Sequence, residues 1–305
     1  MLHLGLDIGG TKTEALLLND RGEELHRERI ATEKASYPAF LERLLAFINH
    51  LRRRADAPFT VGIGLPGAVD PQQGTIKNCN CLVLNGEDLR GDLQRQLDQP
   101  VWLANDADCF TLSEATDGAG AGLDVVFGVI VGTGCGGGVA VRQRLLSGPN
   151  AIAGEWGHNP LPDWSADIDG TPPACYCGRA HCIERFISGT GLSERFNRQW
   201  GTAFSAPQIL AAAQRGDQRA EAHYRHFVDA FARSLGSVIN LLDPDVIVLG
   251  GGLSNVDRLY VDVPLRLERY VFSGACRTAI RQAAFGDASG VRGAAWLPQF
   301  APAPS

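Results

Sequence analysis

Short apolar runs that end in glycine or at a polar corner recur along the chain, and they predict buried β-strands. The first covers residues 2–8, "LHLGLDI", and stops at Gly9 and Gly10. A second strand is expected at 13–18, directly after that turn. Similar runs occur at 59–65, 101–105, 125–131 and 246–250. Each run has the length of a strand and is far shorter than the ~20 residues of a membrane-spanning helix.

Other segments have the helical period instead. The stretch "YPAFLERLLAFINHLRRRA" predicts an amphipathic helix, whose apolar face consists of Phe40, Leu44, Phe47, Ile48 and Leu51. A further helix is expected to begin near residue 106, and helical patterns fill much of 190–240.

One arrangement occurs twice. The strand, glycine turn and strand of "LHLGLDIGGTKTEALLL" resemble the later segment "VVFGVIVGTGCGGGVAV". This indicates two copies of one β-turn-β unit, each of which starts a domain. The pattern therefore predicts two α/β domains around a cleft, and the length of 305 residues agrees with about two domains.

Composition narrows the class of protein. Apolar residues make up 45% of the chain, enough for a sizeable core, and the net charge of −6 argues against a nucleic-acid surface. Asp7 interrupts the first apolar run, so this segment is not expected to be a signal peptide. We expect a cytoplasmic protein without a membrane segment. Its eight cysteines are then expected to stay reduced.

Three strands end in glycine clusters, at Gly9–Gly10, 132–138 and 250–252. Glycine lets a phosphate approach the backbone closely, although a tight hairpin is the simpler explanation of each cluster alone. Two familiar motifs are rejected. The first turn has Walker spacing, but Thr11 follows the second glycine where the motif needs lysine. The second matches G-x-G-x-x-G, but a strand rather than a helix follows it, which argues against a dinucleotide-binding fold.

The stretch "CYCGRAHCIE" concentrates three cysteines, at positions 175, 177 and 182. A redox pair, a nucleophilic thiol, a metal site and three buried thiols are the alternatives. A tetrahedral zinc site needs a fourth ligand, and the sequence offers His181 or His158. A nucleophilic thiol is disfavoured because no Cys-His-Asn arrangement is evident.

The segment "LANDAD" places Asn105 and Asp106 where a strand meets a helix. These residue types are favoured helix N-caps, which is the simple explanation of the pair. A carboxylate and an amide at such a corner also suit a ligand rich in hydroxyl groups.

Five ordered motifs together carry a family resemblance: "DIGGTK", "VGTGCGGG", "GEWGH", "CYCGRAHCIE" and "VIVLGGG". This set resembles the ROK family of sugar kinases from about residue 2 to 297. Within that family, "KNCNCLVLNG" and "GDASGVRGAAWL" look most like bacterial fructokinases of the manno(fructo)kinase type. The resemblance implies a two-domain actin/hexokinase-like ATPase fold (ribonuclease H-like) with the active-site cleft between the domains. The smaller domain would comprise 1–117 with about 289–305, and the larger one 118–288.

The resemblance also implies a site. The residues expected to face the phosphates of ATP, Mg²⁺ and the adenosine are Asp7, Gly9, Gly10, Thr11, Lys12, Gly132, Thr133, Gly134, Gly136, Gly137, Gly250, Gly251 and Gly252. Asp106 would be the general base. The expected sugar contacts are Asn80, Asn105, Asp106, Glu155, His158 and Glu184. The expected ligands of a structural zinc ion are His158, Cys175, Cys177 and Cys182. His181 stands where the family usually has glycine.

The implied function is the ATP-dependent phosphorylation of a hexose, D-fructose to fructose 6-phosphate first. N-acetylglucosamine kinase, glucokinase and mannokinase of the same family are the alternatives, and N-acetylglucosamine kinases are expected to differ around residues 77–86. A sugar-responsive ROK repressor belongs to another class. It is disfavoured because the first strand begins at residue 2, where a repressor would carry its DNA-binding domain. The family also implies a homodimer.

Overall fold

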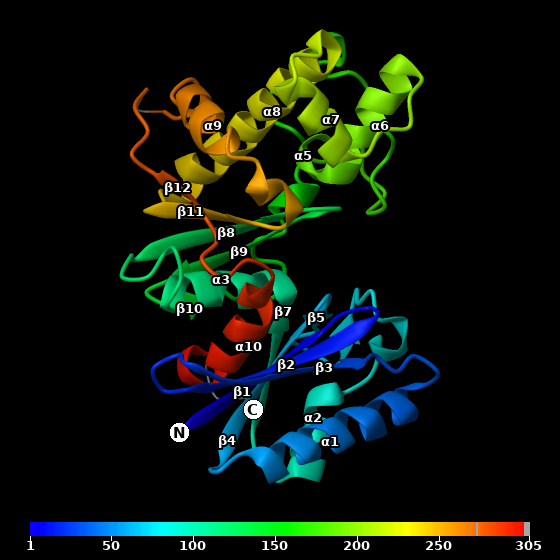
Figure 1. The fold of residues 1–305 in the computed structure, drawn as a ribbon, viewed down its shortest axis with the longest axis vertical. Coiled ribbons are helices and arrows are strands. Elements are labelled where there is room, and N and C mark those ends of the chain that lie inside the picture. The colour runs from blue at the N-terminus through cyan, green and yellow to red at the C-terminus, as the bar shows by residue number, and fades with distance from the viewer. Residues whose placement is uncertain (273, 302–305) are drawn as a thin grey trace. The chain divides into compact units, whose positions relative to one another are not determined.

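The computed structural model describes residues 1–272 and 274–301, and contacts divide it into two compact units (Figure 1). Unit 1 consists of Met1–Gly122, Gly138–Ala153 and Ala284–Ser305, and unit 2 of Leu123–Gly137 and Gly154–Ala283. These boundaries differ from the expected domains mainly at Gly138–Ala153, which groups with unit 1. The reason is local, since a Cβ atom on Gly138 would lie 2.6 Å from Thr111 Oγ1 and 3.0 Å from the Ala107 carbonyl oxygen.

The sheet of unit 1 has the strand order β3-β2-β1-β4-β7. Its strands are β1 (Leu2–Ile8), β2 (Lys12–Asn19), β3 (Glu24–Ala31), β4 (Phe59–Leu65) and β7 (Val101–Asn105). Strand β1 pairs antiparallel with β2 and parallel with β4, and β4 pairs parallel with β7. The carboxyl ends of β1, β4 and β7 therefore meet at one edge of the sheet, as ligand-binding edges of α/β sheets do.

Helices cover both faces of this sheet. The helices are α1 (Tyr37–Arg54), α2 (Leu89–Leu97), α3 (Asp106–Thr116) and α10 (Ser289–Phe300). Helices α1 and α2 share one apolar cluster with the sheet, while α3 and α10 share another. The buried side chains of α1 are the five that the helical period predicts. A short hairpin of β5 (Ala68–Val69) and β6 (Ile76–Lys77), followed by a 3-10 turn η1 (Leu82–Leu84), lies between β4 and α2.

Glycines let helix α10 approach the sheet and α3 more closely than side chains would allow. A Cβ atom on Gly62 would lie 1.9 Å from the carbonyl oxygen of Ala294. A Cβ atom on Gly293 would lie 1.6 Å from the carbonyl oxygen of Cys109. Because such distances are impossible, these positions need glycine for packing and not for an unusual backbone conformation.

The second sheet repeats the strand order of the first, as β10-β9-β8-β11-β12. Its strands are β8 (Val125–Val131), β9 (Cys135–Val141), β10 (Arg144–Leu145), β11 (Val246–Gly250) and β12 (Ala279–Gln282). In each sheet the first strand of the chain lies in the centre, with the second and third strands on one side and the fourth and fifth on the other. The predicted α/β class and the predicted duplication of the β-turn-β unit both agree with this topology.

The helices of unit 2 follow the second glycine turn, and all but α4 begin at or after the end of the cysteine segment. They are α4 (Ala166–Asp169), α5 (Glu184–Ile187), α6 (Gly189–Trp200), α7 (Ala206–Gln214), α8 (Gln218–Leu242) and α9 (Leu259–Leu267). Serine and aspartate caps start the longer ones: Ser205 forms a capping box on α7, and Asp217 accepts a hydrogen bond from Ala220 N–H at the start of α8. Among the residues that the structure describes, no helix has the length and apolar character needed to cross a bilayer.

Candidate functional site

Three strand ends form the polar edge of unit 1. Asp7 on β1 pairs with Gly64 on β4, and Gly64 pairs with Ala104 on β7. Directly beyond β4, the carbonyl oxygen of Gly67 accepts a hydrogen bond of 3.1 Å from the side-chain amide of Asn105. The strand order therefore brings residues from three distant parts of the chain to one place.

Asn105 and Asp106 both act on the first turn of α3. Asn105 is the N-cap, because its side-chain oxygen accepts the Ala107 N–H at 2.8 Å. Asp106 Oδ1 accepts the same N–H at 2.8 Å. A carboxylate in the first turn of a helix is stabilised by the helix dipole. The capping explanation thus holds for Asn105, and the helix end also orients the carboxylate of Asp106.

The carboxyl group of Asp7 binds its proton more tightly than a free aspartic acid does. Burial, together with the nearby carboxylates of Asp106 and Glu14, raises its pKa to about 6, while Lys12 acts in the opposite direction. The start of α10 is close, since a Cβ atom on Gly290 would lie 3.6 Å from Asp7 Oδ2. Asp7 and Asp106 are therefore two acidic groups whose mutual repulsion a cation would relieve.

The turn between β1 and β2 is a tight hairpin. Gly9 N–H donates to the carbonyl oxygen of Lys12 at 2.9 Å. Neither Gly9 nor Gly10 has a left-handed backbone, and a Cβ atom on Gly10 would have no atom of the described residues within 4 Å. Thr11 and Lys12 are exposed. The fold of the hairpin therefore does not require glycine at position 10. The space beside this glycine is open and lies next to the exposed Lys12.

The loop that carries Asn80 is fastened at both ends. Asn85 holds it through two hydrogen bonds to the backbone of Cys79, at 2.8 and 2.9 Å. The Asn80 N–H donates to the Pro66 carbonyl oxygen at 3.0 Å. A Cβ atom on Gly67 would lie 2.8 Å from the Cα of Cys79. Asn80 is therefore tied to the end of β4, the same edge that carries Asn105.

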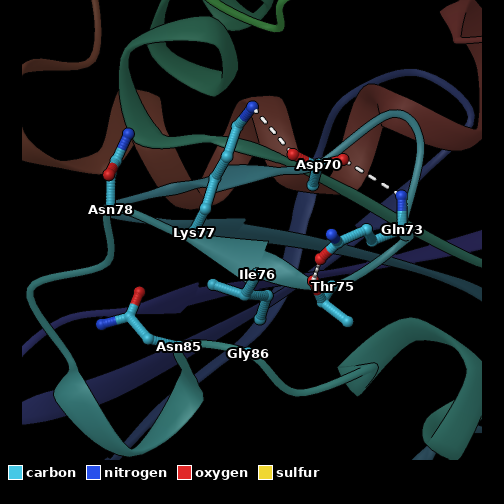
Figure 2. Close-up of a pocket in the computed structure, with 8 residues that line it drawn as sticks. All are labelled: Asp70, Gln73, Thr75, Ile76, Lys77, Asn78, Asn85 and Gly86. Carbon is cyan, nitrogen blue, oxygen red and sulfur yellow. Dashed lines mark hydrogen bonds and ion pairs between the residues drawn. The ribbon is translucent and has the colours of Figure 1, made fainter.

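A polar hollow of about 420 Å³ opens beside this loop (Figure 2). It is lined by Asp70, Gln73, Thr75, Ile76, Lys77, Asn78, Asn85 and Gly86. Lys77 Nζ lies 3.2 Å from Asp70 Oδ2, so the one cation of the lining is paired (Figure 2). Four of its lining residues, Lys77, Asn78, Asn85 and Gly86, belong to the segment 77–86, where N-acetylglucosamine kinases are expected to differ.

In unit 2, the second glycine turn meets the third cluster and a helix end. The carbonyl oxygen of Gly132 accepts the Gly189 N–H of the first turn of α6 at 2.7 Å. A Cβ atom on Gly132 would lie 3.8 Å from the backbone nitrogen of Gly252. Gly251 has a left-handed backbone (φ 80°) and packs on Val131. Two expected parts of one nucleotide site, 132–137 and 250–252, are therefore neighbours within this unit.

Glu184 connects this turn to the cysteine segment. Its carboxylate is 8% exposed and accepts the Cys135 N–H at 3.0 Å through Oε2. Its other oxygen lies 3.8 Å from Cys175 Sγ. Glu184 thus holds the glycine turn, whatever else it binds.

His158, Cys175, Cys177 and Cys182 form one cluster, and their ligand atoms all lie within 4.8 Å of one another. Cys177 Sγ is 3.6 Å from Cys182 Sγ, and Cys175 Sγ is 3.5 Å from His158 Nδ1. A tetrahedral zinc site with Zn–S bonds of ~2.3 Å has edges of about 3.8 Å. The donor set and its spacing therefore fit zinc.

The thiols of this cluster have altered pKa values. Burial raises the pKa of Cys175, and that of Cys182 to about 12. For Cys177, burial acts in the same direction but is outweighed by the hydrogen bond from Arg179 N–H and by its neighbouring thiols, which leave its pKa below the usual value. A bound cation would favour the thiolate at all three positions, because thiolates are the form that ligates metals.

His181 lies outside this cluster. It has a left-handed backbone (φ 59°), as its replacement of the family's glycine suggests. Its ring stacks on Trp164 with the centroids 3.6 Å apart and the planes 16° apart. The sequence left two histidines open as the fourth ligand, and the geometry favours His158.

Nearly the whole chain is similar to one known protein family. The model of the ROK family matches residues 3–300. The chain belongs to the ROK family.

Its ROK relatives include sugar kinases of several kinds. It is 39% identical over 300 residues to the N-acetyl-D-glucosamine kinase of Escherichia coli O6:H1 (strain CFT073), covering 97% of this chain and 99% of that protein. The ROK hexokinase of Thermus thermophilus is 30% identical, with a TM-score of 0.85 over 97% of both chains. A ROK glucokinase of Streptomyces griseus, in complex with glucose and AMPPNP, is 27% identical, with a TM-score of 0.75 over 97% of this chain and 99% of that one.

These relatives confirm the predicted class, a sugar kinase of the ROK family with an actin/hexokinase-like α/β fold. The predicted first substrate was D-fructose, but the relative from Escherichia coli is an N-acetyl-D-glucosamine kinase and not a fructokinase. Two glycines that the sequence did not single out, Gly67 and Gly189, hold Asn105 and Gly132 through hydrogen bonds of their backbone atoms. The "SG" pair at 188–189 was a readable signal for a helix start, because serine is a favoured N-cap.

Proposed function

We propose that this ROK protein transfers the γ-phosphoryl group of ATP to the 6-hydroxyl of a free hexose. The observation that carries the proposal is the acidic pair Asp7 and Asp106, which lies beside an open glycine hairpin at the carboxyl edge of parallel strands. Phosphoryl transfer depends on positioning and on stabilisation of charge, and its recurring parts are a phosphate loop, a cation and an acidic base.

Asp106 is proposed as the general base. It would accept the proton of the attacking sugar hydroxyl, and the first turn of α3 holds its carboxylate in place. The other proposed sugar contacts are Asn80 and Asn105 in unit 1 and Glu155, His158 and Glu184 in unit 2. Asn105 and Glu184 already make internal hydrogen bonds, so they orient the surrounding loops as well.

The glycine turns are proposed to bind ATP. The residues of the first phosphate turn are Asp7, Gly9, Gly10, Thr11 and Lys12, and those of the second are Gly132, Thr133, Gly134, Gly136 and Gly137. Gly250, Gly251 and Gly252 would lie against the adenosine. The start of α6 adds a positive helix end beside Gly132, which favours anions. Asp7 would face Mg²⁺, which supplies positive charge to the phosphates when it is bound.

The cluster of His158, Cys175, Cys177 and Cys182 is proposed to hold a structural zinc ion. Zinc there would fix two loops, 155–158 and 175–184, on which proposed sugar contacts lie. Its contribution is to orient these loops, and phosphoryl transfer itself would use the acidic pair of unit 1.

Two sugars have specific support. N-acetyl-D-glucosamine is supported by the curated relative, which matches over 97% of this chain. D-fructose is supported by the segment "KNCNCLVLNG", whose likeness to fructokinases lies in the loop that carries Asn80 and lines the polar hollow. An ATP-coupled assay over fructose, mannose, glucose and N-acetylglucosamine decides between them. A tenfold or greater preference in kcat/KM for N-acetylglucosamine excludes fructose as the main substrate, and the reverse preference excludes the relative's substrate.

The role of Asp106 has a direct test. We expect Asp106→Asn to lower kcat by about 10²–10⁴-fold, because the amide cannot take the proton. Equilibrium binding of ATP should stay within about twofold of wild type. Asp108→Asn, two residues along the same helix, is the matched control and should keep near wild-type turnover. Wild-type kcat in the Asp106 variant contradicts the proposal.

A further inference from the structure

Tyr176 stands between two cysteines of the cluster and exposes 82% of its surface. Its hydroxyl lies 2.9 Å from His158 Nε2. The two rings meet edge to face, with their centroids 5.1 Å apart and their planes at 89°. The tyrosine is therefore held over the histidine and is not packed into the core.

A third polar group reaches the same atom. Glu155 Oε2 lies 4.0 Å from His158 Nε2, and the Glu155 side chain is 51% exposed. A phenol, an imidazole and a carboxylate thus end together at one solvent-facing place. Such a set of donors and acceptors suits a ligand with several hydroxyl groups, because each hydroxyl both donates and accepts.

A metal ion in the cluster would decide which group donates in the hydrogen bond between His158 Nε2 and the Tyr176 hydroxyl. His158 Nδ1 faces Cys175 Sγ at 3.5 Å, so Nδ1 is the atom turned to the cluster. A ring nitrogen that ligates a metal carries no proton, and the other nitrogen of a neutral ring then carries it. Nε2–H would donate to the oxygen of Tyr176. The hydroxyl proton of Tyr176 remains to donate to another oxygen.

We propose that Tyr176 is a further sugar-contacting residue, whose hydroxyl donates to a hydroxyl oxygen of the bound hexose while its ring covers an apolar C–H face of the sugar. The inference deepens the proposed function and rests on it. In this arrangement the Nε2–H of His158 acts on the sugar through Tyr176, in place of the direct contact proposed for His158 above. It also gives a reason for an aromatic side chain with 82% of its surface in water beside polar groups.

The test compares Tyr176→Phe, Tyr176→Ala and the control Phe272→Ala, which removes a 99% exposed aromatic ring elsewhere in the same unit. Hexose KM and kcat, ATP KM, zinc content and calorimetric sugar binding are measured on each full-length protein. We expect Tyr176→Phe to raise the hexose KM and dissociation constant roughly 3–10-fold, the loss of one hydrogen bond, with a smaller change in kcat. Tyr176→Ala should raise them further, and Phe272→Ala should not. Zinc content and ATP KM should match wild type in all three.

Three results overturn the inference. Unchanged sugar binding in both Tyr176 variants means that Tyr176 does not contact the sugar. Loss of zinc in Tyr176→Phe means that the hydroxyl acts on the metal cluster and not on the sugar. An equal effect of Phe272→Ala means that removal of any exposed ring suffices. If the wild-type protein neither phosphorylates nor binds any of the four hexoses, the proposed function fails as well. An active wild type with unchanged sugar binding in both Tyr176 variants overturns this inference alone.

Discussion

The carboxyl group of Asp7 combines burial with a proposed role at the phosphates. Burial, with the charges of Asp106 and Glu14, raises its pKa from 3.8 to about 6. The folded protein then binds a proton more tightly than the unfolded chain between these two pH values. Stability from this group is therefore complete below about pH 4 and is lost as the pH rises through 6.

We expect Asp7→Asn to stabilise the protein at neutral pH, because the amide avoids the cost of a buried charge. Relative to wild type, its gain in free energy of unfolding should grow by up to about 3 kcal/mol between pH 4 and pH 8. Urea unfolding without Mg²⁺ or nucleotide measures this. Asp20→Asn is the control of opposite sign, since hydrogen bonds from the N-terminus and His3 lower the pKa of the exposed Asp20. A gain for Asp7→Asn that does not depend on pH contradicts the expectation.

At the scale of elements, glycines of two kinds are found in and beside one sheet. Gly62 makes room for helix α10, whereas Gly10 lies in the hairpin between β1 and β2 and borders open space. Sequence gives no way to distinguish them, because both follow or interrupt a buried apolar run. The distinction depends on residue 294, which is distant in the chain.

Alanine at these two positions should have opposite consequences. We expect Gly62→Ala to lower the free energy of unfolding by about 1–3 kcal/mol or more, since the new methyl group would meet a carbonyl oxygen. Gly10→Ala should leave stability within about 0.5 kcal/mol. It should instead raise the KM for ATP, because the methyl group would stand where a phosphate is proposed to approach. Urea unfolding and steady-state kinetics of both variants check this, and an unchanged ATP KM in Gly10→Ala speaks against the phosphate turn.

The cysteine segment carries a second prediction at this scale. We expect His158→Ala to lose zinc, as measured by elemental analysis, and to lower the melting temperature. His181→Ala should retain zinc, because His181 stacks on Trp164 outside the cluster. Loss of zinc only in the His181 variant would make our assignment of the fourth ligand wrong.

For the whole molecule, features that depend on neighbouring residues could be predicted from the sequence, whereas contacts between distant residues could not. The strands 2–8, 59–65 and 125–131 and the buried face of α1 follow from periodicity, since each depends on neighbouring residues. Glu114 illustrates what sequence could not supply. It is fully buried in α3 and accepts hydrogen bonds from Ala284 N–H and Ser289 Oγ, 170 and 175 residues away. The homodimer stays a prediction, which sedimentation of the purified protein would test.

The place of α10 in the fold has a consequence for synthesis. Unit 1 contains the first 122 residues, yet it also needs Ala284–Ser305, which a ribosome makes after all of unit 2. At ~5–20 residues per second, the nascent sheet waits on the order of ten to thirty seconds for the helix that covers one of its faces. Unit 2 can fold while unit 1 is still incomplete. Chaperone binding to ribosome-bound chains should therefore target the first sheet and end when α10 emerges.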